Sequence, residues 1–146
     1  MKVIYKEVKT ISDFIDAIRI RVDVFIIEQK CPVGWEPEEL DKKSTHFVAV
    51  VDNELVATAR LREETKNVAK IERLAVSKEY RGKGIGLGLT KYILNQALKQ
   101  GYKKIWMQAQ AYTQKMYEKA GFKKTSKPYD LWNLGILHID MEYVFK

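Results

Sequence analysis

The chain has 146 residues and a formal net charge of +7; 46% of its residues are hydrophobic and 31% are charged. This size and composition are typical of one globular domain, so we expect a single domain over residues 1–146. No run of about 18 apolar residues occurs, and the first residues lack the apolar core of a signal peptide, so we expect no membrane span. Cys31 is the only cysteine, which excludes an intrachain disulfide and fits a reducing cytoplasm.

The N-terminal segment predicts a strand followed by a helix. Lys2–Val8 alternates between two side-chain faces, as a strand does. Thr10–Asp13 then has the form of a capping box, with Asp in place of Glu, which marks a helix start. The apolar residues after it recur at helical spacing, and we expect them to form core: Phe14, Ile18, Val22, Phe25 and Ile26.

The longest irregular stretch, Cys31–Lys43, contains two prolines and a glycine and therefore predicts a loop. It holds one tryptophan and four carboxylates: Trp35, Glu36, Glu38, Glu39 and Asp41. Two interpretations stay open. Such a loop can cap a cationic ligand, or it is an acidic, solvated loop without a ligand.

Three strands are predicted next, and short polar turns join them into an antiparallel meander. These strands are Thr45–Val51, Leu55–Arg62 and Val68–Val76. The last of them leads into the glycine-rich sequence Tyr80–Gly88, and a helical pattern, Leu89–Leu98, follows. The glycines therefore lie where a strand becomes a helix.

A glycine-rich turn at a helix start is an anion site. Glycine lets the backbone approach a ligand closely, and the first amides of the helix have no partner within the helix. The helix dipole adds positive potential there, and Arg81 and Lys83 add charge. The dinucleotide motif G-x-G-x-x-G and the P-loop motif both fail, because leucines stand where each requires a later glycine.

The positive charge surrounds this turn. Residues 78–127 hold 12 Lys and Arg against two Asp and Glu, a net charge of +10, whereas residues 1–77 have a net charge of −1. A basic surround attracts a polyanionic ligand. Nucleic acid also prefers a basic face. The aromatic residues, however, follow periodic patterns and do not alternate with Lys and Arg along an exposed strand, so we expect no nucleic acid.

The second half of the chain predicts a helix, a strand, a shorter helix and two closing strands. Leu89, Ile93, Ala97 and Leu98 are the expected buried face of the first helix, which Gly101 ends. Because this helix connects two strands, we expect Val68–Val76 and Lys104–Ala109 to pair in parallel. The remaining elements are a helix over Tyr112–Ala120, strands over Phe122–Ser126 and Ile136–Phe145, and a loop over Pro128–Gly135.

The sequence from Arg81 to Gly86 resembles motif A of the GNAT acyltransferases, R/Q-x-x-G-x-G/A, and the element order matches that family. Residues 72–76 before the motif and residues 117–122 after it match as well. Arg21–Gln29 is similar to the R-x-x-V-F-x-x-E-Q segment of a group of small bacterial members. The resemblance implies an α+β (α/β) fold. Its mixed central sheet would have an antiparallel N-terminal meander and a parallel strand pair that splays at the coenzyme A site.

The resemblance also implies where acetyl-CoA binds. In the family, turn amides hold the pyrophosphate, and the pantetheine arm pairs with the fourth strand as an added strand would. By position, the cofactor-binding residues here are Leu74, Ala75, Val76, Arg81, Gly82, Lys83, Gly84, Ile85, Gly86, Gln108 and Tyr112. Three residues are expected on the acceptor side: Arg21, Glu28 and His46. Alternatively, Arg21 and Glu28 are ordinary charged residues on the surface of a helix.

Acyl transfer from a thioester to an amine needs an acid for the thiolate and a group that takes the amine proton. Tyr117 matches the family's acid, with Tyr112 a weaker candidate. Glu72 is the expected base, because a regular strand would place it on one face with Leu74 and Val76. His46, Glu28 or a chain of waters are the alternatives. No Cys/His cluster is present, so we expect no metal.

The sequence therefore predicts an acetyl-CoA-dependent N-acetyltransferase. The acceptor would be the primary amine of a small molecule, attacked directly in a ternary complex. The alternative is a non-catalytic module of the same fold that binds coenzyme A or nucleic acid. Family members are frequently dimers, so a homodimer is an open expectation.

Overall fold

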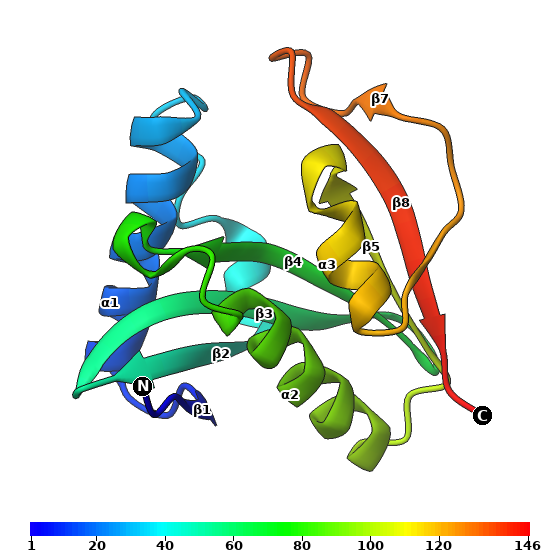
Figure 1. The fold of residues 1–146 in the computed structure, drawn as a ribbon, viewed down its shortest axis with the longest axis horizontal. Helices are drawn as coiled ribbons and strands as arrows, with labels where there is room; N and C mark the ends of the chain where they lie inside the picture. Colours follow the sequence, from blue (N-terminus) through cyan, green and yellow to red (C-terminus); the bar gives the residue numbers. More distant parts are fainter.

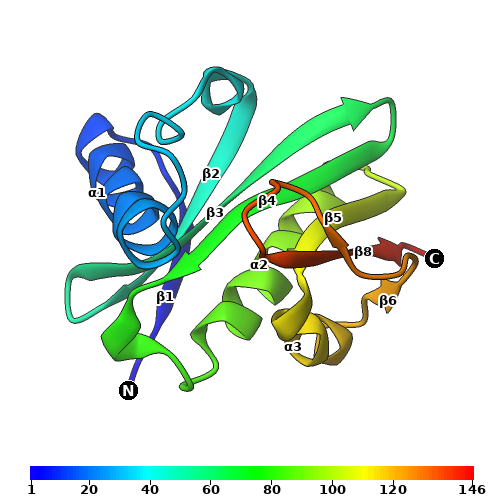
Figure 2. The same cartoon turned by 90° about the horizontal axis from the view of Figure 1, so that it is seen from above.

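The computed structural model describes residues 1–146 as one mixed sheet with helices on both faces (Figures 1 and 2). The strand order is β1-β2-β3-β4-β5-β8-β6, and β7 pairs with β8. Strands β1 to β4 form the predicted antiparallel meander, and β4 and β5 form the predicted parallel pair. The expected fold class is confirmed. No helix is long and apolar enough to cross a membrane.

Most elements lie close to their predicted positions, and β4 has the predicted bounds. In chain order the elements are β1 (Ile4–Glu7), α1 (Ile11–Arg21), η1 (Val22–Glu28), η2 (Glu39–Lys43), β2 (Ser44–Val51), β3 (Glu54–Thr65), β4 (Val68–Val76), η3 (Lys78–Tyr80), α2 (Ile85–Lys99), β5 (Lys104–Gln110), η4 (Ala111–Thr113), α3 (Gln114–Lys119), β6 (Lys123–Lys124), β7 (Tyr129–Asp130) and β8 (Leu137–Val144). The exceptions are η2 and the short strand β7, which lie in segments predicted as loops. Of the η segments, η1 is a π-helix and the others are short 3-10 helices.

The first helix begins as predicted but buries a different face. The Thr10 hydroxyl accepts a hydrogen bond from the Asp13 amide at 3.1 Å, which caps α1. Of the five predicted core residues only Phe25 is buried; the buried stripe is instead Ala17, Ile20, Arg21, Val24 and Phe25. The prediction was wrong because the buried stripe includes a charged residue, Arg21. The neighbouring stripe has only apolar residues, so a search for apolar periodicity finds that one instead.

Helices cover both faces of the sheet. Helices α2 and α3 cover one face, and α1 covers the other (Figure 2). The α2 side holds the main core, in which Ile85, Leu89 and Ile93 pack on Phe47 and Ile71. Leu98 is 52% exposed, contrary to expectation, because the buried stripe of α2 continues from Ile93 to Ala97 and leaves Leu98 beside it.

Candidate active site

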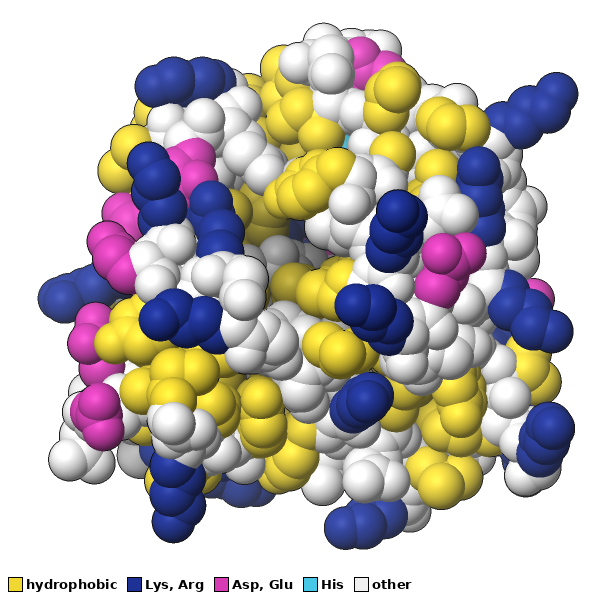
Figure 3. Space-filling view, viewed as in Figure 1, with side chains coloured by type: hydrophobic (Ala, Val, Ile, Leu, Met, Phe, Trp, Pro, Cys, Tyr) yellow, Lys and Arg dark blue, Asp and Glu magenta, His cyan; other side chains and the backbone are white.

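Strands β4 and β5 are paired only where they begin. The paired positions are Val68 with Lys104, Ala69 with Ile105 and Lys70 with Trp106. Beyond them the strands separate, and the gap is part of a cavity of about 800 Å³. Figure 3 shows the molecule hollowed at its centre, with hydrophobic side chains in the hollow and Lys and Arg side chains around it.

The cavity passes through the sheet from one face to the other. On the α2 and α3 side its wall includes Leu74, Val76, Met116 and Tyr117. On the α1 side its wall includes Arg60, Glu72, Gln108 and His138. A thioester in the gap would therefore be reached by one set of groups from each face.

The glycine turn forms one end of the cavity. Gly82 and Gly84 have φ of +75° and +80°, conformations that other L-residues rarely adopt. Gly84 is the N-cap of α2, and the first intrahelical bond runs from the Gly88 amide to the Gly84 carbonyl at 3.0 Å. No side chain caps this helix, so the amides of residues 85–87 are free to bind an anion.

Most of the predicted cofactor residues line this cavity. They are Leu74, Ala75, Val76, Arg81, Gly82, Gly84, Ile85, Gly86, Gln108 and Tyr112. Lys83 is exposed and does not contribute to the wall. Gln108 lies on the α1 side, where its amide oxygen accepts a hydrogen bond from Lys70 Nζ at 2.6 Å and its amide nitrogen donates to Tyr129.

A β-bulge in β4 changes which residues share a face. Glu72 pairs with Arg60 and Ala75 pairs with Thr58, so Arg73 and Leu74 together oppose a single residue of β3. Arg73 has φ of +58°, which is rare for a residue with a side chain. As a result Leu74 and Val76 face the main core, whereas Glu72 faces the α1 side. The expectation that Glu72 shares their face was wrong, because it assumed regular alternation.

Glu72 lies among cations. Its carboxylate is 3.1 Å from Arg60 Nη2, 2.6 Å from Arg62 Nε and 3.3 Å from Lys70 Nζ. Burial opposes its ionisation, but the hydrogen bond from Arg62 and the charges of Arg60 and Lys70 outweigh burial and lower its pKa to about 2. A carboxylate this acidic is a poor acceptor of an amine proton, so this geometry does not favour the predicted base role.

Two of the four carboxylates of the acidic loop, Glu36 and Asp41, are buried and already paired, whereas Glu39 is exposed. Arg21 is 1% exposed and donates to Glu36 at 2.5 Å and to Asp41 at 2.8 Å. Asp41 also accepts from Arg60 at 2.8 Å, and Glu36 accepts from Arg73 at 3.0 Å. Glu36 and Asp41 therefore neutralise arginines of the chain itself, so for these two carboxylates neither interpretation of the loop was right.

The predicted acceptor residues do not meet in the cavity. Arg21 belongs to the buried ion-pair cluster just described. His46 is buried against Phe14, with its Nε2 3.0 Å from the Asp41 carbonyl oxygen. Glu28 lies outside the cavity wall and forms two 2.8 Å hydrogen bonds with Arg81.

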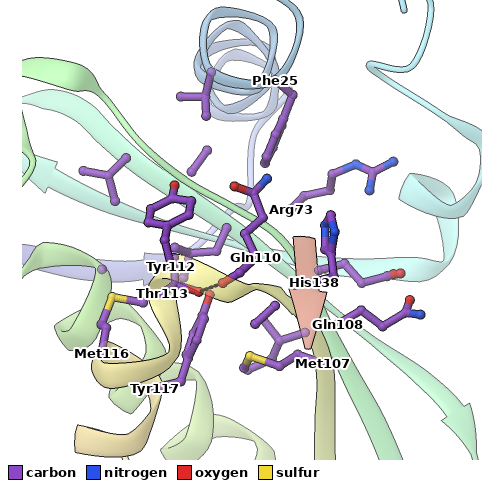
Figure 4. Close-up of a pocket in the computed structure, with 18 of the residues that line it drawn as sticks. Phe25, Arg73, Met107, Gln108, Gln110, Tyr112, Thr113, Met116, Tyr117 and His138 are labelled. Atoms are coloured by element: carbon purple, nitrogen blue, oxygen red, sulfur yellow. Dashed lines mark hydrogen bonds between the residues drawn. The ribbon is translucent and has the colours of Figure 1, made fainter. Parts of the chain in front are cut away.

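Tyr117, the predicted acid, is a core residue that also lines the cavity. Its ring packs on Phe122 within the main core, and its hydroxyl points into the cavity (Figure 4). The hydroxyl makes no hydrogen bond to another protein group. Burial raises the pKa of Tyr117, so the phenol keeps its proton at neutral pH.

Three side chains that sequence reasoning missed, Gln29, Gln110 and His138, lie at the same gap. The amides of Gln29 and Gln110 exchange hydrogen bonds of 2.9 and 2.8 Å and join the two sides of the cavity. His138 on β8 is the register partner of Gln110 and lines the cavity (Figure 4). Nothing in the sequence distinguished His138, because it alternates with apolar residues along the last strand just as Asp140 and Glu142 do.

A comparison with protein families decides the identity. Residues 17–145 match the model of the acetyltransferase (GNAT) domain. The chain belongs to the GNAT acetyltransferase family. The match includes the glycine turn, the separated strands and Tyr117, so the resemblance noted from the sequence is confirmed.

Several relatives are similar over most of their length. The chain is 30% identical to the uncharacterized N-acetyltransferase YjcF of Bacillus subtilis, over 86% of this chain and 89% of that one. It is 29% identical to protein ElaA of Escherichia coli, over 90% and 88%.

Two crystal structures share the fold. That of Escherichia coli ElaA superposes with a TM-score of 0.84 at 25% identity and covers 97% of this chain and 99% of its own. That of an acyl-CoA N-acyltransferase from Pseudomonas aeruginosa superposes with a TM-score of 0.79 at 27% identity, covering 97% of each chain.

Proposed function

We propose that this GNAT protein transfers the acetyl group of acetyl-CoA to the primary amine of a small molecule. Acetyl-CoA would bind with its pyrophosphate on the free amides of residues 85–87 and its pantetheine arm in the gap between β4 and β5. One observation carries the proposal: a single cavity joins the free amides of α2 to the Tyr117 hydroxyl through the opening in the sheet.

The reaction is a direct attack in a ternary complex. The amine nitrogen attacks the thioester carbonyl carbon, the carbon–sulfur bond breaks, and the sulfur takes a proton from Tyr117. Placing both substrates in one gap supplies much of the rate by proximity. Backbone amides of β4 near the bulge would polarise the thioester carbonyl.

Calorimetry with acetyl-CoA, followed by thiol release with a panel of primary amines, tests this function. We expect binding and amine-dependent release of coenzyme A. Binding without release for any amine would favour the alternative, a coenzyme A-binding module without transferase activity. A cytoplasmic location and a homodimer stay predictions.

A further inference from the structure

His138 stands on the α1 side of the cavity, opposite the side from which Tyr117 enters. It projects from β8 beside Gln110, its register partner on β5 (Figure 4). His138 is only 1% exposed, yet its ring lines the cavity. An amine that reaches the thioester from this face would meet His138, because Tyr117 occupies the other face.

One hydrogen bond of the His138 ring determines its tautomer. Nδ1 lies 2.9 Å from the Ile136 carbonyl oxygen. A carbonyl only accepts, so Nδ1 carries the proton and donates it. In the neutral ring Nε2 is then an unprotonated acceptor. Nε2 has no hydrogen-bond partner in the protein, yet it is not fully enclosed by protein atoms. Because His138 lines the cavity, we infer that Nε2 faces it.

Aromatic residues hold the ring in place. Trp132 packs edge-on against His138, with the ring centroids 4.5 Å apart. Trp132 in turn packs against Trp35 at 5.5 Å, which ties the β7–β8 loop to the loop before η2. Asp130 stabilises the same loop by accepting hydrogen bonds from the amides of Leu134 and Gly135.

Several titratable and charged groups lie around His138, but burial decides its charge state. Tyr129 on β7 is its register partner, and Asp130 is the next residue, opposite Leu137. Asp140 lies two residues further along β8 and accepts a hydrogen bond from Tyr129, and Arg73 approaches from β4. Burial lowers the pKa of His138, outweighing its hydrogen bond to Ile136 and the charge of Asp130. The imidazole is therefore mainly neutral at pH 7, with its Nε2 unprotonated.

We propose that His138 is the general base of the acetyl transfer, with Nε2 accepting the proton that the attacking amine loses. This assignment rests on the proposed function. As the nitrogen–carbon bond forms, the amine proton moves to His138 Nε2; as the carbon–sulfur bond breaks, the thiolate takes the Tyr117 proton. His138 then releases its proton to water, and Tyr117 regains one from water.

Kinetics of His138→Asn test the assignment. Asparagine can still donate to the Ile136 carbonyl but has no group in place of Nε2. We expect kcat/KM to fall by about 100-fold to 1,000-fold, a typical loss for one base, with acetyl-CoA affinity unchanged. In the wild type kcat/KM should fall as pH drops through a pKa below 6.5, and this limb should vanish in the variant. Leu137→Ala, an exposed neighbour on β8, is the matched control.

Histidine NMR of the wild-type protein gives a second readout that does not need activity or a folded variant. We expect the Nδ1–H tautomer for His138. An Nε2–H tautomer, or a His138→Asn variant that keeps both its rate and its acidic limb, would overturn the base assignment alone. A wild-type protein that binds acetyl-CoA but acetylates no amine would overturn the proposed function and the base with it.

Discussion

Glu28 and Arg81 form a two-pronged ion pair that joins the end of η1 to the glycine turn. Both Arg81 Nη atoms donate to the Glu28 carboxylate at 2.8 Å, and Arg81 Nε donates to the Val76 carbonyl at 3.0 Å. The hydrogen bonds from Arg81 lower the pKa of Glu28. The sequence assigned these residues to different substrates, but the fold pairs them beside the glycine turn.

The first prediction concerns this pair. If the cofactor phosphate must draw Arg81 away from Glu28, Glu28→Gln will raise acetyl-CoA affinity. The pair is part-exposed, so the gain should be at most about fivefold, the equivalent of about 1 kcal/mol. Arg81→Ala should instead weaken binding. Calorimetry measures both. Weaker binding in Glu28→Gln would mean that the carboxylate positions Arg81 for the phosphate.

The second prediction concerns the glycine turn. Gly84→Asp places a carboxylate where a phosphate should bind, and we expect acetyl-CoA affinity to fall at least about tenfold. Gly101→Asp is a matched control, because Gly101 has a similar φ of +87° and, like Gly84, has no atom within 4 Å of an added Cβ. Both variants carry the same backbone strain, so an equal loss of affinity would show that strain, not charge, is responsible.

The third prediction concerns stability. Glu72 is 13% exposed and neutralises Arg60, Arg62 and Lys70. Glu72→Gln should lower the free energy of unfolding by at most about 3 kcal/mol, the lower end for breaking a buried ion pair. Arg62 and Lys70 lose their closest carboxylate, whereas Arg60 keeps its pairs with Asp41 and Glu38. Glu142→Gln, which removes a surface pair with Lys104, should cost less than about 1 kcal/mol. Urea denaturation at pH 7 compares them.

The stabilisation that Glu72 provides should decrease as the pH falls. The folded-state pKa of Glu72 is lowered from its ordinary 4.5 to about 2, so its stabilisation is complete above pH 4.5 and is lost as pH falls toward 2. The difference in unfolding free energy between the wild type and Glu72→Gln should shrink over that range. A difference that is constant with pH would show that Glu72 is not held ionised by its neighbours.

The sequence predicted the antiparallel meander, the parallel pair and the position of the glycine turn, because each depends on local pattern or on a family motif. It missed the bulge, since nothing marks Arg73 as a residue with positive φ. It could not assign partners to Glu36 and Asp41, because Arg21 and Arg60 reach them only in the folded chain. His138 becomes a site residue through the pairing of β8 with β5, which no local pattern encodes.

The fourth prediction concerns Tyr117. Tyr117→Phe keeps the ring packed on Phe122 and removes a hydroxyl that no protein group binds, so thermal stability should hold. We expect kcat to fall about tenfold to a thousandfold with little change in acetyl-CoA affinity. Tyr92→Phe, from the same core but outside the cavity, is the control. A normal kcat in Tyr117→Phe would transfer the acid role to another group, with Tyr112 or a bound water next.

A crystal structure with acetyl-CoA bound tests the central claim most directly. We predict the pyrophosphate on the amides of residues 85–87, the pantetheine arm between β4 and β5, and the sulfur beside the Tyr117 hydroxyl. His138 should then face the thioester carbon from the opposite side. Acetyl-CoA bound outside the gap, or a thioester out of reach of both Tyr117 and His138, would contradict the account.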